Sequence, residues 1–146
     1  MLKKDKTLVL YLCTGNACRS QMAEGWTRTL KSDSIVAFSA GILPAGLVSS
    51  RAVKVMAEVG VNISEQYSKH ISELSGINFD YVITLCDNAQ QNCPIFVGNG
   101  KVIHKPFVDP TVVIGSDEEI MTAFRKTRDE IKEFILTLPE KLEEEN

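Results

Sequence analysis

A cysteine and an arginine separated by five residues are the first positions in this chain that could do chemistry together. Residues 13–20 read Cys-Thr-Gly-Asn-Ala-Cys-Arg-Ser. A short loop at a helix N-terminus can direct several backbone N–H groups at one anion, helped by the helix dipole. An arginine adds a planar fork that suits the oxygens of an oxyanion. The predicted anion-binding residues are Thr14, Gly15, Asn16, Ala17, Cys18, Arg19 and Ser20.

Cys13 is the candidate nucleophile of this loop. The same positive surroundings should stabilise its thiolate and lower its pKa, which makes it reactive at neutral pH. Gly15 is predicted to supply a backbone φ that other residues resist, and the Asn16 side chain to brace the loop from behind. The alternative is a buried structural Cys13 with Arg19 on a helix surface. The strand before the loop, the helix after it and the glycine within it argue against that alternative.

Strands and helices alternate along the chain, and this alternation positions the loop. Apolar runs predict four strands, at residues 7–12, 35–40, 81–85 and 101–104. Alternation of this kind indicates a parallel α/β sheet with helices on both faces, whose ligands bind outside the carboxyl ends of the strands. Cys13 and Cys86 each follow such an end. We therefore expect the two cysteines to lie at one edge of the sheet.

Three helices are predicted from periodicity and capping residues. The first begins near Ser20, runs to residue 30 and turns Trp26 toward the core. The second is capped by Ser49 or Ser50 and ends before Gly60. The third is predicted to begin at a capping box formed by Ser116 and Glu119. Its apolar stripe comprises Ile120, Met121, Phe124, Ile131, Phe134, Ile135 and Leu138.

Composition narrows the class of protein. The 146 residues are 24% charged and 44% hydrophobic with a net charge of −3, which is typical of one globular domain, here residues 1–146. The absence of a basic excess argues against nucleic acid, and no apolar run approaches the roughly 18 residues of a membrane span. The apolar run near the N-terminus is shorter than that of a secretory signal. We expect a soluble, cytoplasmic monomer.

Four cysteines in a reducing compartment suggest catalysis, redox chemistry or metal binding rather than structural disulfides. They are Cys13, Cys18, Cys86 and Cys93. Structural zinc sites space paired ligands by about two to four residues, whereas four and six residues separate the pairs here. His70 and His104 show no ligand spacing and are expected to be surface or satisfied histidines. We therefore predict no metal site.

Residues Cys13 to Gly25, Cys-Thr-Gly-Asn-Ala-Cys-Arg-Ser-Gln-Met-Ala-Glu-Gly, resemble the signature of the thioredoxin-coupled arsenate reductases. These enzymes share a fold and an anion loop with the low-molecular-weight protein tyrosine phosphatases. Further segments that resemble the reductases are Ser39-Ala40-Gly41, Val82-Ile83-Thr84-Leu85-Cys86 and Asn92-Cys93-Pro94. Asp109-Pro110 lies where both families carry a catalytic acid. The resemblance implies a three-layer α/β/α fold with a central four-stranded parallel sheet.

The resemblance also implies a mechanism that needs no cofactor. Cys13 would attack arsenate held by the loop and Arg19, while Asp109 donates a proton to the departing oxygen. Cys86 would then attack Cys13 and release arsenite, and Cys93 would attack Cys86. Thioredoxin would reduce the resulting Cys86–Cys93 disulfide. Phosphate and sulfate would compete with arsenate for the loop.

The segment between the two later cysteines, residues 87–92, is polar. We expect it to be exposed and mobile, because a resolving thiol has to travel.

Two other functions stay open. A low-molecular-weight protein tyrosine phosphatase would use Cys13, Arg19 and Asp109 alone. The paired tyrosines that these phosphatases carry after the acid are missing, since Thr111-Val112 follow Pro110, and this weakens the phosphatase interpretation. A non-catalytic anion-binding or redox-sensing module is the third hypothesis.

Two side chains near the loop have open roles. Cys18 could form a protective disulfide with Cys13 or be a small loop residue, and we favour the small residue. Some reductases of the family bind potassium through an Asn, a Glu, a Ser and an Asp. Asn16, Glu24 and Ser39 match the first three, and Lys69 stands at the fourth position. We hypothesise that the Lys69 ammonium replaces the cation.

Overall fold

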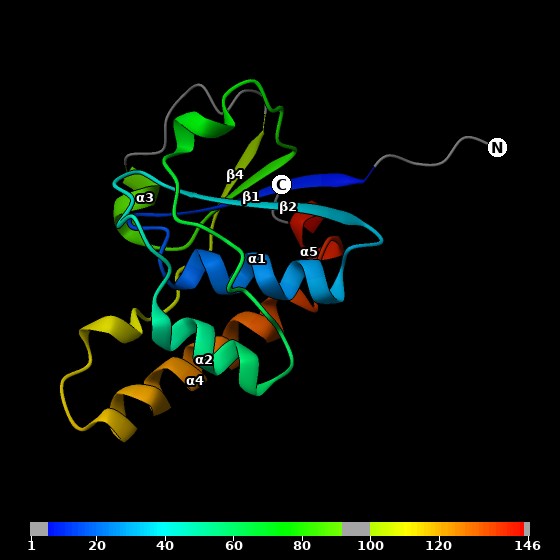
Figure 1. Cartoon of the computed structure of the whole chain (residues 1–146). Coiled ribbons are helices and arrows are strands. Elements are labelled where there is room, and N and C mark those ends of the chain that lie inside the picture. The colour runs from blue at the N-terminus through cyan, green and yellow to red at the C-terminus, as the bar shows by residue number, and fades with distance from the viewer. Residues whose placement is uncertain (1–5, 92–99, 145–146) are drawn as a thin grey trace.

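A four-stranded parallel sheet organises the molecule (Figure 1). The computed structural model describes residues 6–91 and 100–144. The strands, in the spatial order β2-β1-β3-β4, are β1 (Thr7–Cys13), β2 (Ile35–Gly41), β3 (Tyr81–Thr84) and β4 (Lys101–His104). The predicted α/β class and four-stranded parallel sheet are confirmed. The strand bounds differ from the prediction by one residue at most, with β3 ending at Thr84 rather than Leu85.

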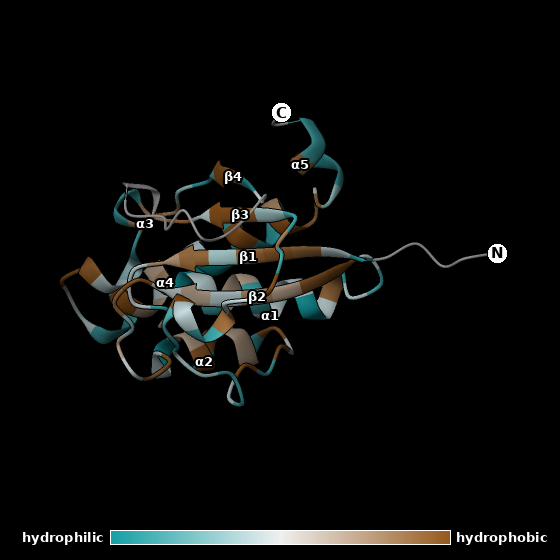
Figure 2. Cartoon of the chain, turned by 90° about the horizontal axis from the view of Figure 1, so that it is seen from above, coloured by the Kyte–Doolittle hydropathy of each residue, from teal (hydrophilic) through white to brown (hydrophobic). Residues whose placement is uncertain are grey.

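Strand register brings the two candidate cysteines to the same edge. Strand β1 pairs with β2 along its whole length, so that Cys13 lies opposite Gly41. On its other side β1 pairs with β3, with Leu12 opposite Thr84. Cys13 ends β1, and Cys86 follows β3 by two residues. Figure 2 shows the strands side by side, with α3 beyond their ends and the N-terminus at the opposite side.

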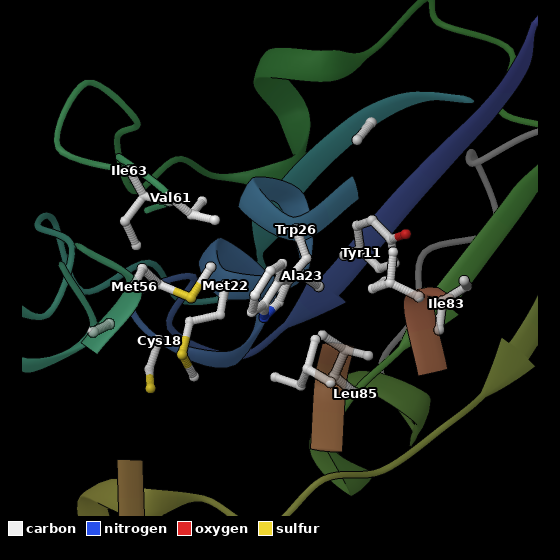
Figure 3. Close-up of a cluster of buried hydrophobic side chains, with 14 of the residues drawn as sticks. Tyr11, Cys18, Met22, Ala23, Trp26, Met56, Val61, Ile63, Ile83 and Leu85 are labelled. Atoms are coloured by element: carbon white, nitrogen blue, oxygen red, sulfur yellow. The ribbon is translucent and has the colours of Figure 1, made fainter. Parts of the chain in front are cut away.

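The larger helical layer covers one face of the sheet (Figure 1). It contains α1 (Arg19–Leu30), α2 (Ser50–Glu58), α4 (Asp117–Ile135) and the short α5 (Glu140–Glu144). Helix α1 is central, because its residues 20–27 are all buried between the sheet and its neighbours. Trp26 is only 3% exposed, which confirms its predicted place in the core, and its indole N–H donates to the Arg128 carbonyl over 3.0 Å. Figure 3 shows this cluster.

Capping explains where α2 and α4 begin. The Ser49 hydroxyl accepts from the Ala52 N–H, and Ser116 with Glu119 forms the predicted capping box. Helix α4 ends at Ile135, so Leu138, predicted to belong to its stripe, is buried after the helix. The sequence analysis missed α5, which is too short to show helical periodicity. Among the described residues, no helix has the length and apolar character needed to cross a membrane.

The opposite face has a thinner cover of short helices, η1 (Ile71–Leu74) and α3 (Asp87–Gln91). Leu10, Leu12 and Val82 of the sheet pack there with Ile71 and Ala89. Residues 87–91 of the segment that we expected to be exposed and mobile form a helix, which was not predicted, whereas Asp87 and Asn88 are exposed as expected. The buried Ala89 methyl explains the difference, because it fixes one face of that helix on the sheet.

Candidate active site

The backbone of the loop after β1 is held from outside at every carbonyl. The Cys13 carbonyl accepts from the Ile42 N–H, that of Thr14 from the Leu43 N–H, and that of Gly15 from the Ala45 N–H and the Ser68 hydroxyl. The Asn16 carbonyl accepts from the Gln21 side-chain amide, that of Ala17 from the Ser49 N–H, and that of Cys18 from the Met22 N–H. These bonds are 2.8–3.2 Å long. In a trans peptide the N–H points opposite to the C=O. Outward carbonyls therefore turn the N–H groups of residues 14–19 toward the inside of the loop.

A small cavity of about 120 Å³ lies inside the loop. It is lined by Cys13, Gly15, Asn16, Ala17, Cys18, Arg19, Asp109 and Thr111. Three of the predicted catalytic residues therefore meet around one hollow. Two of the predicted anion-binding residues are absent from its lining: Thr14 turns its hydroxyl to Cys86, and Ser20 is fully buried, where it accepts a hydrogen bond from Asn16.

The left-handed residue of the loop is Asn16 and not Gly15. Asn16 has a φ of 49°, and Gly15 is absent from the described residues with positive φ. Asparagine tolerates this conformation when its side chain bonds locally. Its amide donates to Ser20 Oγ over 2.8 Å and accepts from the Lys69 N–H over 2.9 Å. The prediction for Gly15 is thus wrong, whereas the predicted brace from Asn16 is present.

Arg19 and Asp109 face each other across the cavity. The guanidinium Nη2 lies 3.5 Å from Asp109 Oδ2, and Nη1 donates to the Phe107 carbonyl over 3.0 Å. The other Asp109 oxygen accepts from both the N–H and the hydroxyl of Thr111, over 2.9 and 2.6 Å. The acid is therefore oriented by the start of η3 (Pro110–Val112) and aimed at the arginine.

The thiols of Cys13 and Cys86 form a coupled pair. Their mutual hydrogen bond and burial raise the pKa of Cys13, against the lowering effect of Arg19. The same hydrogen bond, with help from Thr14, lowers the pKa of Cys86 to about 5. The pair thus shares one proton. The predicted lowering of the Cys13 pKa is wrong for this pair, because a second thiolate beside the first is disfavoured.

Cys86 and Asn88, at the start of α3, both contact the anion loop. The Cys86 Sγ lies 3.2 Å from Thr14 Oγ1, and the Asn88 amide donates to the same hydroxyl over 3.0 Å. Thr14 therefore links the loop to the second cysteine. Cys93 lies outside the described residues, so its predicted role as the last thiol remains a prediction from sequence.

Cys18 packs into the hydrophobic core at the first turn of α1. It is 7% exposed, belongs to the cluster that contains Met22 and Met56, and is a free thiol. Figure 3 shows its side chain at the edge of that cluster. Burial raises the pKa of Cys18 to about 12. The packing supports the interpretation of Cys18 as a small apolar residue of the loop.

The Lys69 ammonium lies behind the loop, where the sequence analysis placed it. It donates to the carbonyls of Ser39 and Tyr67 over 3.1 and 3.0 Å. The Ser39 hydroxyl in turn donates to Glu24 over 2.5 Å. Burial lowers the pKa of Lys69, and the Glu24 carboxylate opposes that shift. Among the described residues, no group of histidine, cysteine and carboxylate side chains is arranged to hold a metal ion.

Gly41 is a site residue whose role the sequence analysis missed. A Cβ on Gly41 would lie 2.6 Å from the Thr14 carbonyl oxygen, which no side chain can do. The bare backbone of β2 therefore lets the loop fold against the sheet. In the sequence, Gly41 is visible only as a glycine at the carboxyl end of a predicted strand. The pairing of β1 with β2 places it opposite Cys13, beside the loop.

Together these features define a class. A parallel α/β sheet whose β1 ends in a cysteine, followed by a loop of inward N–H groups and an arginine, is a phosphatase-like fold with a thiol at its anion loop. The chain belongs to the low molecular weight phosphotyrosine protein phosphatase family, whose model matches residues 8–146.

Relatives within this family include both reductases and phosphatases. The arsenate reductase of Halalkalibacterium halodurans is 44% identical over 136 residues, which are 93% of this chain and 97% of the relative. A solved arsenate reductase in its phosphate-binding state is 32% identical with a TM-score of 0.76, covering 90% of this chain and 95% of that one. A phosphatase of T. tengcongensis is 27% identical with a TM-score of 0.74, covering 93% and 99%.

Proposed function

We propose that this protein reduces arsenate to arsenite through a relay of three cysteines that thioredoxin recycles. The observation that carries the proposal is the contact between the Cys13 and Cys86 thiols beside the anion cavity. Hydrolysis of a phosphate ester needs one thiol, whereas reduction of an oxyanion needs a second thiol that forms a disulfide with the first. The arsenate reductases among its relatives support arsenate as the substrate.

The first step is attack on arsenate by Cys13. The inward N–H groups and Arg19 hold the oxyanion, which competes with Asp109 for the guanidinium. The released Asp109 carboxylate takes up a proton from solvent and donates it to the departing oxygen. The shared proton passes from Cys13 to Cys86 across their hydrogen bond, which makes Cys13 the nucleophile. A sulfur–arsenic bond forms, an arsenic–oxygen bond breaks, and the oxygen leaves as water. Arsenic remains As(V).

The second step is attack by Cys86 on the Cys13 sulfur. Cys86 first loses to solvent the proton that it accepted in the first step, and its thiolate, stabilised by Thr14, then forms the sulfur–sulfur bond. The sulfur–arsenic bond breaks with its electron pair on arsenic, so As(V) becomes As(III) and leaves as arsenite. The two sulfurs are oxidised by the same two electrons. Two thiols and one arsenate thus yield one disulfide, one arsenite and one water.

The third step returns the loop to its starting state. Cys93 attacks Cys86, which frees Cys13 and leaves a Cys86–Cys93 disulfide for the two thiols of thioredoxin to reduce. The role of Cys93 rests on its sequence motif. We propose that the chain does this as a single-domain cytoplasmic monomer, with phosphate and sulfate as competing anions, since one cavity made of N–H groups and an arginine suits any small tetrahedral oxyanion.

The test is NADPH consumption by the reduced protein with arsenate, thioredoxin and thioredoxin reductase. We expect sustained turnover by the natural chain. Cys93→Ser should stop after one equivalent of arsenite per protein, and Cys86→Ser should release none. Omitting thioredoxin should likewise limit the natural chain to one equivalent.

Hydrolysis of an aryl phosphate by the same variants separates this proposal from the alternative. If arsenate drives no NADPH consumption while Cys13→Ser abolishes aryl phosphate hydrolysis, the protein is a low-molecular-weight phosphatase that uses Cys13, Arg19 and Asp109. The Cys86–Thr14 contact would then lack a role in turnover.

A further inference from the structure

His104, the last residue of β4, joins two segments through both of its ring nitrogens. Its Nδ1 lies 2.8 Å from Thr84 Oγ1, at the end of β3. Its Nε2 lies 3.0 Å from Asp87 Oδ1, in the first residue of α3. The imidazole is largely enclosed, with 20% of its side chain exposed, whereas that of Asp87 is 81% exposed. A largely enclosed ring therefore holds an exposed carboxylate.

The hydrogen bond between His104 and Asp87 can form in either protonation state of the ring. In neutral His104, Thr84 donates to Nδ1 and the Nε2–H donates to Asp87. In the imidazolium, Nδ1–H donates to Thr84, whose own hydrogen can turn to the Ile103 carbonyl 3.5 Å away. In both states Nε2 donates to Asp87. The bond to Asp87 therefore does not depend on the charge of the ring, and His104 serves as a tether.

The tether acts on the residue next to Cys86. Cys86 and Asn88 contact Thr14 on the anion loop, while Asp87, between them, is bound from the other side by β4. Three successive residues at the start of α3 are thus held between the loop and the last strand. For attack, the Cys86 sulfur must lie in line with the bond between the Cys13 sulfur and arsenic, which breaks in this step. Misplacement by about 1 Å can cost up to about 100-fold in rate.

We propose that His104 is a positioning residue for the resolving thiol: through Asp87 it holds the start of α3 so that the Cys86 sulfur meets the Cys13 sulfur. This inference deepens the proposed function and rests on it for its role in turnover. His104 touches neither the substrate cavity nor either reacting sulfur among the contacts of the structure. It should therefore act on the second step and leave the first step alone.

The first experiment uses the Cys93→Ser background, in which the relay stops at the Cys13–Cys86 disulfide. The rate of disulfide formation after adding arsenate is measured by quenching and counting free thiols. We expect His104→Phe, which keeps a ring but no donor, to be about tenfold slower. His104→Gln, whose amide can reach Asp87 in place of Nε2, should recover most of the rate. Aryl phosphate hydrolysis should be the same in all three proteins.

A second readout needs no arsenate and so separates the failure of this inference from failure of the proposed function. Diamide, a general oxidant of thiol pairs, is added to the same three proteins, and the Cys13–Cys86 disulfide is followed by peptide mass spectrometry. Slower closure in His104→Phe with recovery in His104→Gln supports the positioning role even if arsenate is not the substrate. Equal closure rates in all three proteins overturn it.

The partner residue gives an independent check. Asp87→Ala should slow disulfide formation about as much as His104→Phe, and the double variant should be no slower than either, because both remove one bond. Additive losses would overturn the tether. So would a parallel loss of aryl phosphate hydrolysis and melting temperature in His104→Phe, because that pattern marks a general structural role.

Discussion

The two halves of the active site are built in different ways. In the loop from Cys13 to Arg19, hydrogen bonds between backbone groups or to backbone carbonyls fix six consecutive peptides. At the start of α3, the residues around Cys86 are held by side chains, those of Thr14 and His104. We call the loop from Cys13 to Arg19 the cage. Most of its hydrogen bonds join backbone groups and do not depend on side-chain identity, whereas a side-chain tether disappears with one substitution.

This difference suits the two tasks that we propose. The cage has to present the same N–H groups to an oxyanion in every cycle, and preorganised donors bind best when they do not move. The segment that carries Cys86 has to meet Cys13 and then release it to Cys93. Side-chain tethers can be broken and remade during each cycle.

Gly41→Ala should have the largest effect on stability and activity, because it adds a methyl group against the cage at a point where no side chain fits. Its Cβ would lie 2.6 Å from the Thr14 carbonyl oxygen and 3.1 Å from the Asn16 nitrogen. The loop or β2 must shift, which we expect to cost about 2 kcal/mol in the free energy of unfolding and about 100-fold in aryl phosphate hydrolysis. Urea unfolding and steady-state kinetics measure the two quantities.

Gly46→Ala is the control, since its Cβ would meet nothing within 4 Å, although its φ of +91° makes alanine costly there too. It should lower stability without a comparable loss of activity. Equal activity of Gly41→Ala and the natural chain would mean that the cage is softer than its hydrogen bonds indicate.

Thr14→Val should weaken the second step and spare the first. Its hydroxyl helps to hold the pKa of Cys86 near 5, and removing it raises that pKa. The Cys86 thiolate is the reactive form above its pKa, so the midpoint of the rate of disulfide formation against pH moves to higher pH. Because this hydrogen bond is made to a charged group, its loss should lower the rate of disulfide formation about tenfold or more at pH values below the new midpoint.

Single-turnover disulfide formation in the Cys93→Ser background, followed from pH 4 to pH 8, measures this shift. Thr14→Ser keeps a hydroxyl and should restore the natural midpoint. An unchanged pH profile in Thr14→Val would mean that Thr14 does not lower the pKa of Cys86.

Sequence was sufficient for the local parts of this architecture. The strand–loop–helix unit around Cys13, the capping box at Ser116 and the four strands follow from patterns within a few residues. The errors concern groups brought together from afar. Cys86 lies far along the chain from Cys13, so the pKa of the pair could not be read from the loop motif. Asn16 takes the left-handed conformation because it also binds the Lys69 N–H, 53 residues away.

The helix at 87–91 was missed for a similar reason. Residues 87–92 are polar in sequence, and the helix at 87–91 depends on Ala89 packing on the sheet. The tether from His104 to Asp87 spans 17 residues, and no spacing rule connects a lone histidine to a loop carboxylate. Long-range contacts therefore decide the second half of the site, and short-range patterns decide the first.

Potassium should have a smaller effect, of less than about twofold on kcat/KM when it replaces sodium at equal ionic strength. The Lys69 ammonium already donates to the Ser39 carbonyl beside Glu24, and a second cation there would be repelled. Lys69→Ala should make the melting temperature depend on potassium, because a bound cation stabilises the folded state by mass action. Clear activation of the natural chain by potassium would rule out the hypothesis that Lys69 replaces the cation.

The smallest effect is expected from a side-chain tether far from the site. Glu58 of α2 accepts from Arg125 over 2.9 Å and from Arg128 over 2.8 Å, both on α4. Arg125, and then Arg128, lower the pKa of Glu58. Its contribution to stability is therefore present above the ordinary carboxyl pKa and is lost as pH falls through the lower folded value. Glu58→Gln should lower the melting temperature slightly at pH 7.

The difference between Glu58→Gln and the natural chain should become smaller as the pH falls and Glu58 takes up a proton, and it should also shrink at high salt. Thermal unfolding at pH 7 and at pH 3 measures it, while aryl phosphate hydrolysis and disulfide formation stay unchanged. A loss of either activity would show that the contact of α2 with α4 reaches the loop through Ser49, which both caps α2 and binds the Ala17 carbonyl. The division of the site into cage and tethers would then have to include this outer contact.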